Sequence, residues 1–307
     1  MILLLGVVLA GCSAPAAIEK VLTQATPGPK YTSISPEQSR YLESLPEEYQ
    51  RLTIPYLKQY PTPGSEITIE SKVAEHSNFT SYIASYQSDG LKIYGLLTKP
   101  KTSDANQKFP AVVFLHGYIA PTVYKTTEKY VEYVDYLARN GLVVFKIDYR
   151  GNGESEGNPG GSYYSSDYVI DALNAYESLK TLADVNPAKV GLWGHSMGGN
   201  VVMRAVAARP EIPAAVIWAG AGYTYTDLAE YRINDLTYQS ARQDPNRRNR
   251  QQMYELVGQV SSDSPFWSLV AATNFLVDVK TRIEIHHAVN DTVVNVGYSR
   301  GDQSWIY

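Results

Sequence analysis

The sequence contains a single cysteine, Cys12, among its 307 residues. One cysteine excludes an internal disulfide and any zinc site built on several cysteines. Basic residues are not in excess either, since 27 Lys and Arg stand against 31 Asp and Glu, for a net charge of −4. Nucleic acid is therefore not expected as a partner. The sequence also lacks internal repeats, which argues against a propeller or a solenoid.

The apolar run at residues 1–10 is too short to cross a bilayer, which takes roughly 20 residues. It ends in Leu9-Ala10-Gly11-Cys12, a pattern that resembles the lipobox of bacterial lipoproteins. We therefore expect residues 1–12 to be a lipoprotein-type signal peptide, with Cys12 as the lipidated residue of an exported, membrane-anchored protein. An ordinary secretory signal with an incidental cysteine is the alternative, because no Lys or Arg precedes the run.

Residues 13–75 hold 8 of the 17 prolines. Proline at this density prevents long helices and interior strands. We therefore interpret residues 13–75 as a tether, to about Ser35, followed by an N-terminal extension that packs along the outside of the main domain. A short helix is expected around residues 36–49, with Ser35 as its N-cap and Pro36 at its first position.

Residues 76–307 carry the pattern of one α/β domain. Alternating runs at 79–86 and 91–98 flank the turn residues Ser88-Asp89-Gly90 and predict an antiparallel hairpin. Further strands are expected at 111–115, 142–147, 190–193, 214–218 and 283–286, and helices at 127–140, 165–182 and 199–208. This order predicts a doubly wound, mostly parallel sheet covered on both faces, with its ligand site at the carboxyl ends of the strands.

The segment Gly194-His195-Ser196-Met197-Gly198-Gly199 lies between a predicted strand and a predicted helix. It matches G-x-S-x-G in the strand–turn–helix context that presents a nucleophilic serine. Side chains at the glycine positions would clash in so sharp a turn. We therefore predict that Ser196 is a nucleophile. The expected oxyanion donors are the backbone N–H groups of Met197 and of Tyr118, which follows the strand at 111–115.

Together with His116-Gly117-Tyr118 and Asp148-Tyr149-Arg150-Gly151-Asn152-Gly153-Glu154-Ser155, this segment resembles the α/β-hydrolases. It is most similar to the catalytic domain of the prolyl oligopeptidase family, including dipeptidyl- and acylaminoacyl-peptidase-like members, over about residues 79–298. The resemblance implies a serine hydrolase that cleaves a small peptide or ester through an acyl-enzyme, without metal or cofactor. Many esterases share these motifs, so a carboxylesterase is the alternative. The turn at 148–155 is expected to close the floor of the site without taking part in the chemistry.

The resemblance also implies an acid that orients a catalytic histidine, and this position falls on Asp291, with Asp278 as the weaker alternative. The histidine should follow one more helix and strand. Only 16 residues follow Asp291 (307 − 291), and none is histidine. None of the five histidines occupies the family's position for the base; they are His76, His116, His195, His286 and His287. We therefore expect a chain truncated before its last helix and strand, or alternatively a catalytically impaired or non-catalytic binding protein.

The segment at about 222–280 shows no strand pattern and is expected to form a helical cap over the site. Its aromatic residues include Tyr223, Tyr225, Phe266 and Trp267. They are expected either to line a substrate pocket or to form the small core of the cap itself.

Overall fold

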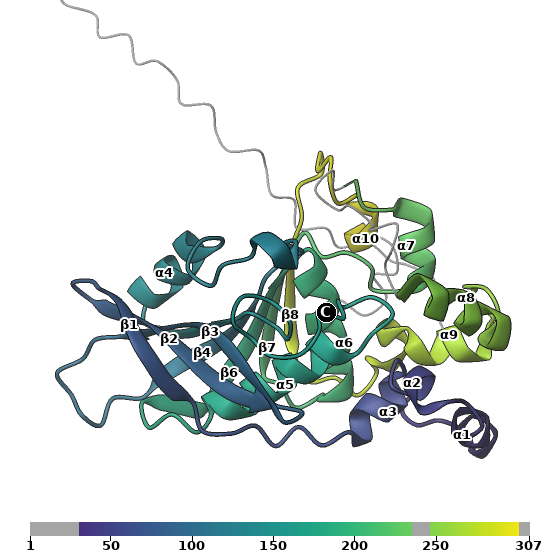
Figure 1. Ribbon diagram of the computed structural model, residues 1–307, viewed down its shortest axis with the longest axis horizontal. Helices are drawn as coiled ribbons and strands as arrows, with labels where there is room; N and C mark the ends of the chain where they lie inside the picture. The colour runs from purple at the N-terminus through teal and green to yellow at the C-terminus, as the bar shows by residue number, and fades with distance from the viewer. Residues whose placement is uncertain (1–30, 235–245, 301–307) are drawn as a thin grey trace, which may run out of the picture.

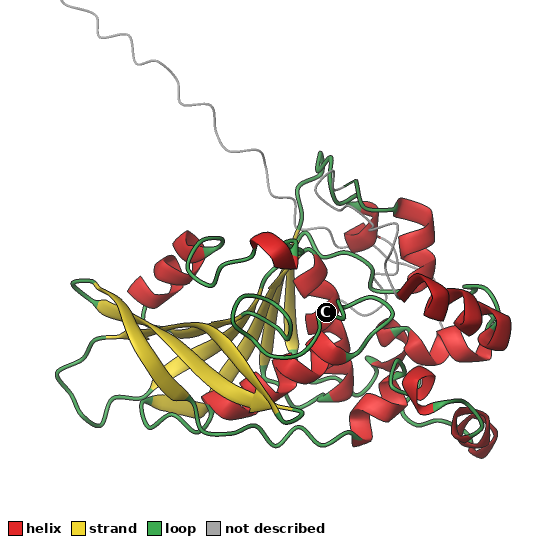
Figure 2. Cartoon of the chain, in the orientation of Figure 1, coloured by secondary structure: helices red, strands yellow, loops and turns green. Residues whose placement is uncertain are grey.

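The computed structural model describes residues 31–234 and 246–300. Within these residues, eight strands form one sheet in the order β1-β2-β3-β5-β4-β6-β7-β8 (Figure 1). Helices lie on both faces of the sheet and extend beyond one end of it (Figure 2). The predicted α/β fold with a mostly parallel sheet is confirmed.

The antiparallel part of the sheet consists of β1 (Thr68–Glu75), β2 (Phe79–Ser88) and β3 (Leu91–Pro100). Strands β2 and β3 form the predicted hairpin, and the two residues between them, Asp89 and Gly90, have φ angles of 52° and 75°. Two consecutive left-handed residues are typical of a tight turn that matches the twist of the strands. Because β1 precedes residue 76, the sheet begins inside the segment that the sequence assigns to the N-terminal extension.

Five parallel strands follow at the positions of the apolar runs. They are β4 (Phe109–Leu115), β5 (Val143–Ile147), β6 (Val185–His195), β7 (Ala214–Trp218) and β8 (Arg282–His286). The register pairs Leu115 with Gly194, and Trp218 with both His195 and His286. The carboxyl ends of four neighbouring strands therefore lie in one row, which is where ligand sites form in such sheets.

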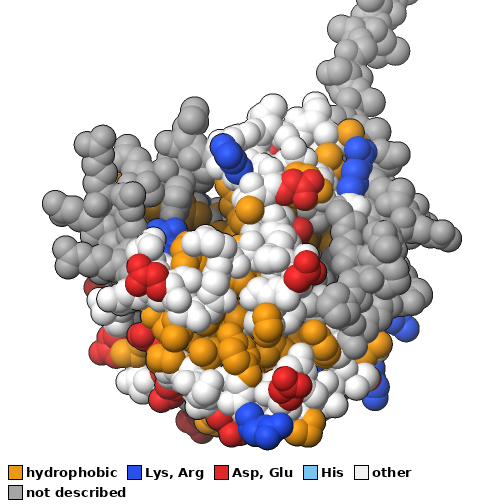
Figure 3. Space-filling model, turned by 90° about the vertical axis from the view of Figure 1, so that its right-hand side faces the viewer, with side chains coloured by type: hydrophobic (Ala, Val, Ile, Leu, Met, Phe, Trp, Pro, Cys, Tyr) orange, Lys and Arg blue, Asp and Glu red, His pale blue; other side chains and the backbone are white. Residues whose placement is uncertain are grey.

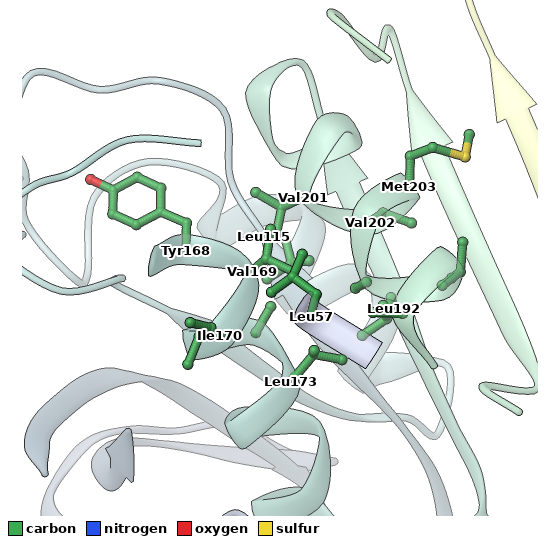
Figure 4. Close-up of a cluster of buried hydrophobic side chains, with 14 of the residues drawn as sticks. Leu57, Leu115, Tyr168, Val169, Ile170, Leu173, Leu192, Val201, Val202 and Met203 are labelled. Atoms are coloured by element: carbon green, nitrogen blue, oxygen red, sulfur yellow. The ribbon is translucent and has the colours of Figure 1, made fainter. Parts of the chain in front are cut away.

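Helices α5 (Asp167–Leu179) and α6 (Met197–Ala208) pack on one face of the sheet and on each other. Figure 4 shows the core that results, in which Val169, Leu173 and Val201 gather near Leu115 of β4. The opposite face contacts α4 (Val131–Arg139), which packs on β3 and β5 and is preceded by the short helix η1 (Pro121–Val123). All three α-helices overlap the ranges that the sequence predicts.

The N-terminal segment forms three short helices. They are α1 (Pro36–Glu43), α2 (Glu47–Gln50) and α3 (Ile54–Gln59). Ser35 caps α1 as predicted, and its hydroxyl accepts the N–H of Gln38. The expectation of one helix over 36–49 is wrong, because Pro46 cannot continue a helix and α2 begins only after it.

Arg204 of α6 and Arg209, which directly follows this helix, hold the extension against the domain. The buried Arg204 donates to the carbonyl oxygen of Leu52, and Arg209 donates to those of Leu57 and Tyr60. Six apolar side chains of the extension are buried in the same core: Leu42, Leu45, Tyr49, Leu52, Ile54 and Leu57. Residues 36–60 are thus fixed to the helix whose other end carries the candidate nucleophile.

The cap contains helices only, as far as the structure describes it. They are α7 (Tyr225–Tyr231), α8 (Asn246–Val257), α9 (Pro265–Val270) and the short η2 (Ala272–Phe275). The side chains of Tyr223, Tyr225, Phe266 and Trp267 are at most 6% exposed. They belong to the same hydrophobic core as side chains of α5 and α6, so this segment packs onto the main domain. After β8, the described residues contain one more helix, α10 (Gly297–Arg300).

Figure 3 shows the end of the molecule at which the N-terminal helices and the cap helices lie. Hydrophobic side chains gather in a band across the middle of this face, with charged side chains around it. Among the helices that the structure describes, none combines the length and the apolar character needed to span a membrane.

Candidate active site

Ser196 lies at the bend between β6 and α6, at the carboxyl end of a central strand. Its backbone angles are φ 53° and ψ −117°, a combination that is rare and strained for a residue with a side chain. The bend is held by hydrogen bonds from the Ser196 N–H to the Trp218 carbonyl and from the Gly199 N–H to the Ser196 carbonyl. Within the described residues, the Ser196 hydroxyl itself has no hydrogen-bond partner.

The glycines around Ser196 are required by close backbone packing. A Cβ on Gly194 would lie inside van der Waals contact of the Gly198 carbonyl, and one on Gly198 would overlap the Leu115 carbonyl of β4. A Cβ on Gly199 would come within 2.7 Å of the Cα of Gly220. The glycine positions of the motif therefore bring three backbone segments together beneath the serine.

The loop after β4 lies directly beside the serine. A Cβ on Gly117 would be 3.2 Å from the Cβ of Ser196. Tyr118 follows Gly117, and Met197 is the first residue of α6, where amide N–H groups have no acceptor within the helix. The structure thus brings Ser196, Met197 and the segment that carries Tyr118 together at the N-terminus of α6, which is the positive end of the helix dipole.

His116 is buried and holds this loop. Its Nδ1 lies 2.6 Å from the Gly117 carbonyl oxygen and its Nε2 lies 3.5 Å from that of Asp148; because a carbonyl can only accept, the neutral ring carries its one proton on Nδ1, at the much shorter contact. Burial lowers the pKa of His116 to about 3, and the nearby Lys146 ammonium adds to this. The ring is therefore neutral near pH 7 and serves as a hydrogen-bond donor to the backbone.

Asp291 follows β8 at the same edge of the sheet. Its Oδ1 accepts the N–H groups of Val293 and Val294 at 2.8 and 2.9 Å, which closes the turn that the sequence shows as D-x-x-V. Its Oδ2 is 3.7 Å from Nε2 of His287. The Asp291 charge also acts on His195, where it opposes the lowering of the pKa by burial. Asp291 therefore lies within electrostatic range of the residue that precedes Ser196.

The described histidines have partners other than the Ser196 hydroxyl. His195 bonds through Nδ1 to the Tyr130 hydroxyl, at 2.7 Å. His287 is buried, with Nδ1 at 2.7 Å from the Ser299 hydroxyl and Nε2 at 2.8 Å from the Val294 carbonyl. His286 lies 2.9 Å from Glu284, and His76 stacks on Phe79 between β1 and β2. None of them is placed as a base toward the serine.

The turn at 148–155 lies behind the loop that follows β4. Asp148 is fully buried and accepts the hydroxyls of Tyr124 and Thr126, both at 2.6 Å. Arg150 is paired with the buried Asp171 of α5 at 2.6 Å. These bonds tie the loop and the turn to β5 and α5.

Two residues of the site gave no signal in the sequence. Lys146 is buried on β5 and donates to the Tyr124 hydroxyl at 3.0 Å, and burial lowers its pKa to about 8. The Tyr130 hydroxyl contacts both Gly117, in the loop after β4, and His195, the last residue of β6. Neither belongs to a motif, and both act through contacts between distant segments. The predicted lipidation site, Cys12, lies outside the described residues.

The fold and the sharp bend at Ser196 between β6 and α6, called the elbow from here on, define an α/β-hydrolase. Residues 106–300 match the family described as serine aminopeptidase, S33. This match spans more than half of the chain, so the protein belongs to this family of serine hydrolases.

Individual relatives match over parts of the chain. The uncharacterized protein YfhR of Salmonella typhi is 33% identical over 109 residues, which are 30% of this chain and 36% of that protein. A probable dipeptidyl-aminopeptidase B of Paracoccidioides brasiliensis is 24% identical over 179 residues, 52% of this chain and 19% of that protein. The matches thus cover about a third of the first relative and about a fifth of the second.

Among solved structures, the acetyl xylan esterase from Paenibacillus sp. R4 has a TM-score of 0.54 at 16% identity, covering 86% of this chain and 91% of that chain. At this identity the likeness shows the fold alone. The predicted α/β-hydrolase fold and the resemblance to dipeptidyl-peptidase-like proteins are confirmed by these matches.

Proposed function

We propose that the protein cleaves an amide or ester bond through an acyl-enzyme on Ser196. The observation that carries this proposal is the strained bend at Ser196, whose hydroxyl has no partner among the described residues and lies beside Gly117. The hydroxyl would attack the substrate carbonyl, and its proton would pass to a base. The N–H groups of Met197 and Tyr118 would stabilise the oxyanion that forms.

Asp291 is proposed to orient that base. Because none of the described histidines contacts the Ser196 hydroxyl, the base has to come from elsewhere, or the rate falls to what the oxyanion hole and substrate binding supply. That residual rate is roughly 10³–10⁴ above the reaction in water. The same observation favours the second candidate, a non-catalytic protein that binds its ligand at this fold's usual site.

The experiment that tests the proposal compares the protein with its Ser196→Ala variant. Both are incubated with p-nitrophenyl acetate, with and without added imidazole as a base, and the masses of the intact proteins and of their peptides are measured. We expect one acetyl group on the peptide that contains Ser196, formed faster with imidazole and absent from the variant. A peptide containing Ser196 that takes up no acetyl group, or that is labelled no faster than the corresponding peptide of the variant, would refute the nucleophile and favour the non-catalytic candidate.

The substrate class is proposed to be a small peptide, with a carboxylic ester as the alternative. Amide and ester cleavage share the nucleophile and the oxyanion hole, so these residues do not distinguish them. Aminoacyl anilides and p-nitrophenyl esters of matched acyl groups would do so. A protein that turns over only the esters, even with a dipeptidyl acyl group, would be a carboxylesterase.

We also propose that the protein is exported and anchored to a membrane by a lipid on Cys12. The support is the run of residues 1–12 alone. A Cys12→Ser variant that still sediments with membranes would contradict the anchor.

A further inference from the structure

The hydroxyl of Tyr130 connects the two segments that carry the proposed chemistry. It accepts the N–H of Gly117 at 3.1 Å and lies 2.7 Å from Nδ1 of His195. Gly117 directly precedes the oxyanion donor Tyr118, and His195 directly precedes the nucleophile Ser196. We propose that Tyr130 is a positioning residue that sets the separation of the oxyanion donor from the serine. This inference rests on the proposed function.

The contacts around Gly117 show how tightly the two segments approach. A Cβ on Gly117 would lie 2.8 Å from the Tyr130 hydroxyl oxygen, 3.1 Å from His195 Nδ1 and 3.2 Å from the Cβ of Ser196. Atoms of three residues from two segments, Tyr130 and the pair His195 and Ser196, thus converge on one backbone position. A hydrogen bond at this point restrains the loop relative to the elbow more directly than a bond farther along either segment.

Both peptide units that meet at Gly117 are held by side chains, and the second of them carries the proposed oxyanion donor. The carbonyl of Gly117 and the N–H of Tyr118 belong to one planar unit and point in opposite directions. His116 holds the carbonyl at 2.6 Å, while Tyr130 holds the N–H on the other side of Gly117. The direction of the Tyr118 N–H is therefore set directly by His116, while Tyr130 holds the preceding peptide unit and so fixes where Gly117 lies beside His195 and Ser196.

The two hydrogen bonds of the Tyr130 hydroxyl, to Gly117 and to His195, form a bridge whose proton count fits a neutral tyrosine and a neutral histidine. A tyrosine hydroxyl has one proton, and since its oxygen accepts the Gly117 N–H, that proton is available to Nδ1 of His195. Nδ1 accepts it only when the imidazole is neutral. Burial lowers the pKa of His195, and the nearby His287 acts in the same direction, while Asp291 opposes both.

The backbone of Tyr130 is strained in a way that aims its side chain at the site. Its φ and ψ are 65° and 6°, the left-handed region, immediately before α4 begins. Residues with a Cβ adopt this region at an energetic cost and persist there where packing enforces it. The ring packs edge-on against Phe114 of β4, with centroids 5.7 Å apart, which holds the hydroxyl over Gly117.

The test uses the variant Tyr130→Phe, which keeps the ring and removes only the hydroxyl. Its matched control is Tyr133→Phe in the helix that follows, because Tyr133 is 49% exposed and its hydroxyl makes no hydrogen bond to the described residues. Two quantities are measured. The first is the amide exchange of Gly117, which requires no catalysis. The second is the acylation of Ser196 by p-nitrophenyl acetate, resolved into the rate at saturation and the binding constant of the ester.

We expect Tyr130→Phe to speed the exchange of Gly117 by about tenfold and to slow acylation at saturation by about tenfold, the effect of one hydrogen bond. The binding constant of the ester should not change, and Tyr133→Phe should match the unmodified protein in both measurements. A loss of overall stability would instead speed exchange throughout α4 and the sheet.

Each other result overturns the inference. Unchanged exchange of Gly117 shows that the bridge does not restrain the loop, whatever the serine does. Faster exchange with unchanged acylation shows that the restraint does not serve the chemistry. Failure of the proposed function itself is recognised separately, from the unmodified protein and Ser196→Ala alone. It is shown if the peptide around residue 196 gains no acetyl group in the unmodified protein beyond what the same peptide of the variant gains.

Discussion

The sharp bend at Ser196 depends on three nearby residues without side chains, Gly194, Gly198 and Gly199. The Ser196 φ of 53° would cost roughly 1–2 kcal/mol in an unsupported chain, and hydrogen bonds to Trp218 and Gly199 hold it in place. Gly198 brings the start of α6 onto the carbonyl of Leu115, so β4 and the elbow are in backbone contact. The position of Ser196 relative to the loop after β4 is therefore set by close backbone contacts that only glycine permits.

Substitution of Gly198 by alanine is expected to move the loop after β4 away from the elbow. The new Cβ would overlap a backbone carbonyl, which cannot rotate aside, and overpacking of this kind costs about 2–3 kcal/mol. Unfolding in urea and acylation of Ser196 should both be measured. The control is Gly141→Ala, where φ is 84° and no atom lies within 4 Å, so only backbone strain of about 1 kcal/mol arises. A Gly198→Ala protein that acylates as well as Gly141→Ala would contradict this account.

Helix α6 connects the site to the N-terminal extension. Its first turn follows the elbow, and Arg204 in its second half is 2% exposed. The Arg204 guanidinium donates to the carbonyls of Leu52, Ser162 and Ser165 and to the hydroxyl of Ser166. Burial lowers the pKa of Arg204, and the charge is stabilised by these backbone dipoles rather than by a close carboxylate. The extension is thus held by the same helix that follows Ser196, the proposed nucleophile.

We expect Arg204→Met to loosen the extension before the rest of the fold. The change removes the donor to Leu52 and leaves carbonyl oxygens without a partner, at a cost of about 1–3 kcal/mol for each buried group. Limited proteolysis with mass detection should then show early cleavage within residues 36–60. Arg40→Met is the control, because the Arg40 side chain is exposed on α1 and, among the described residues, bonds only to the Pro36 carbonyl of the same helix. Equal cleavage of the two variants would show that Arg204 does not anchor the extension.

Elements that depend on local pattern were predictable from the sequence, and those that depend on distant contacts were not. The buried parallel strands, the turn at Asp89 and Gly90 and the elbow at Ser196 follow from residue types within a few positions. The role proposed for Tyr130 depends on the chain folding back so that Tyr130 lies over Gly117, thirteen residues earlier in the sequence. No local sequence pattern marks this contact. The burial of the cap aromatics likewise depends on packing between α7 and α9, which composition alone left open.

The stability of the whole molecule depends on pH through three buried histidines near the site, whose neutral form the fold favours. Burial is the main cause that lowers the pKa of His116, His195 and His287. Each of them is more easily protonated in the unfolded chain, where the ordinary value is near 6.5. Their contribution to stability is therefore fully present above pH 6.5 and is lost as the pH falls toward the folded values.

His116 should dominate this loss, because its pKa falls to about 3 and its ring is 1% exposed. Between pH 6.5 and 3, one such group lowers the free energy of unfolding by about 1.4 kcal/mol per pH unit, a large share of a typical total of 5–15 kcal/mol. His116→Asn keeps a donor for the Gly117 carbonyl but does not titrate. Urea unfolding of both proteins from pH 8 to pH 4.5 should therefore show a shallower decline for the variant. Parallel curves would mean that His116 is protonated as easily in the folded protein as in the unfolded chain.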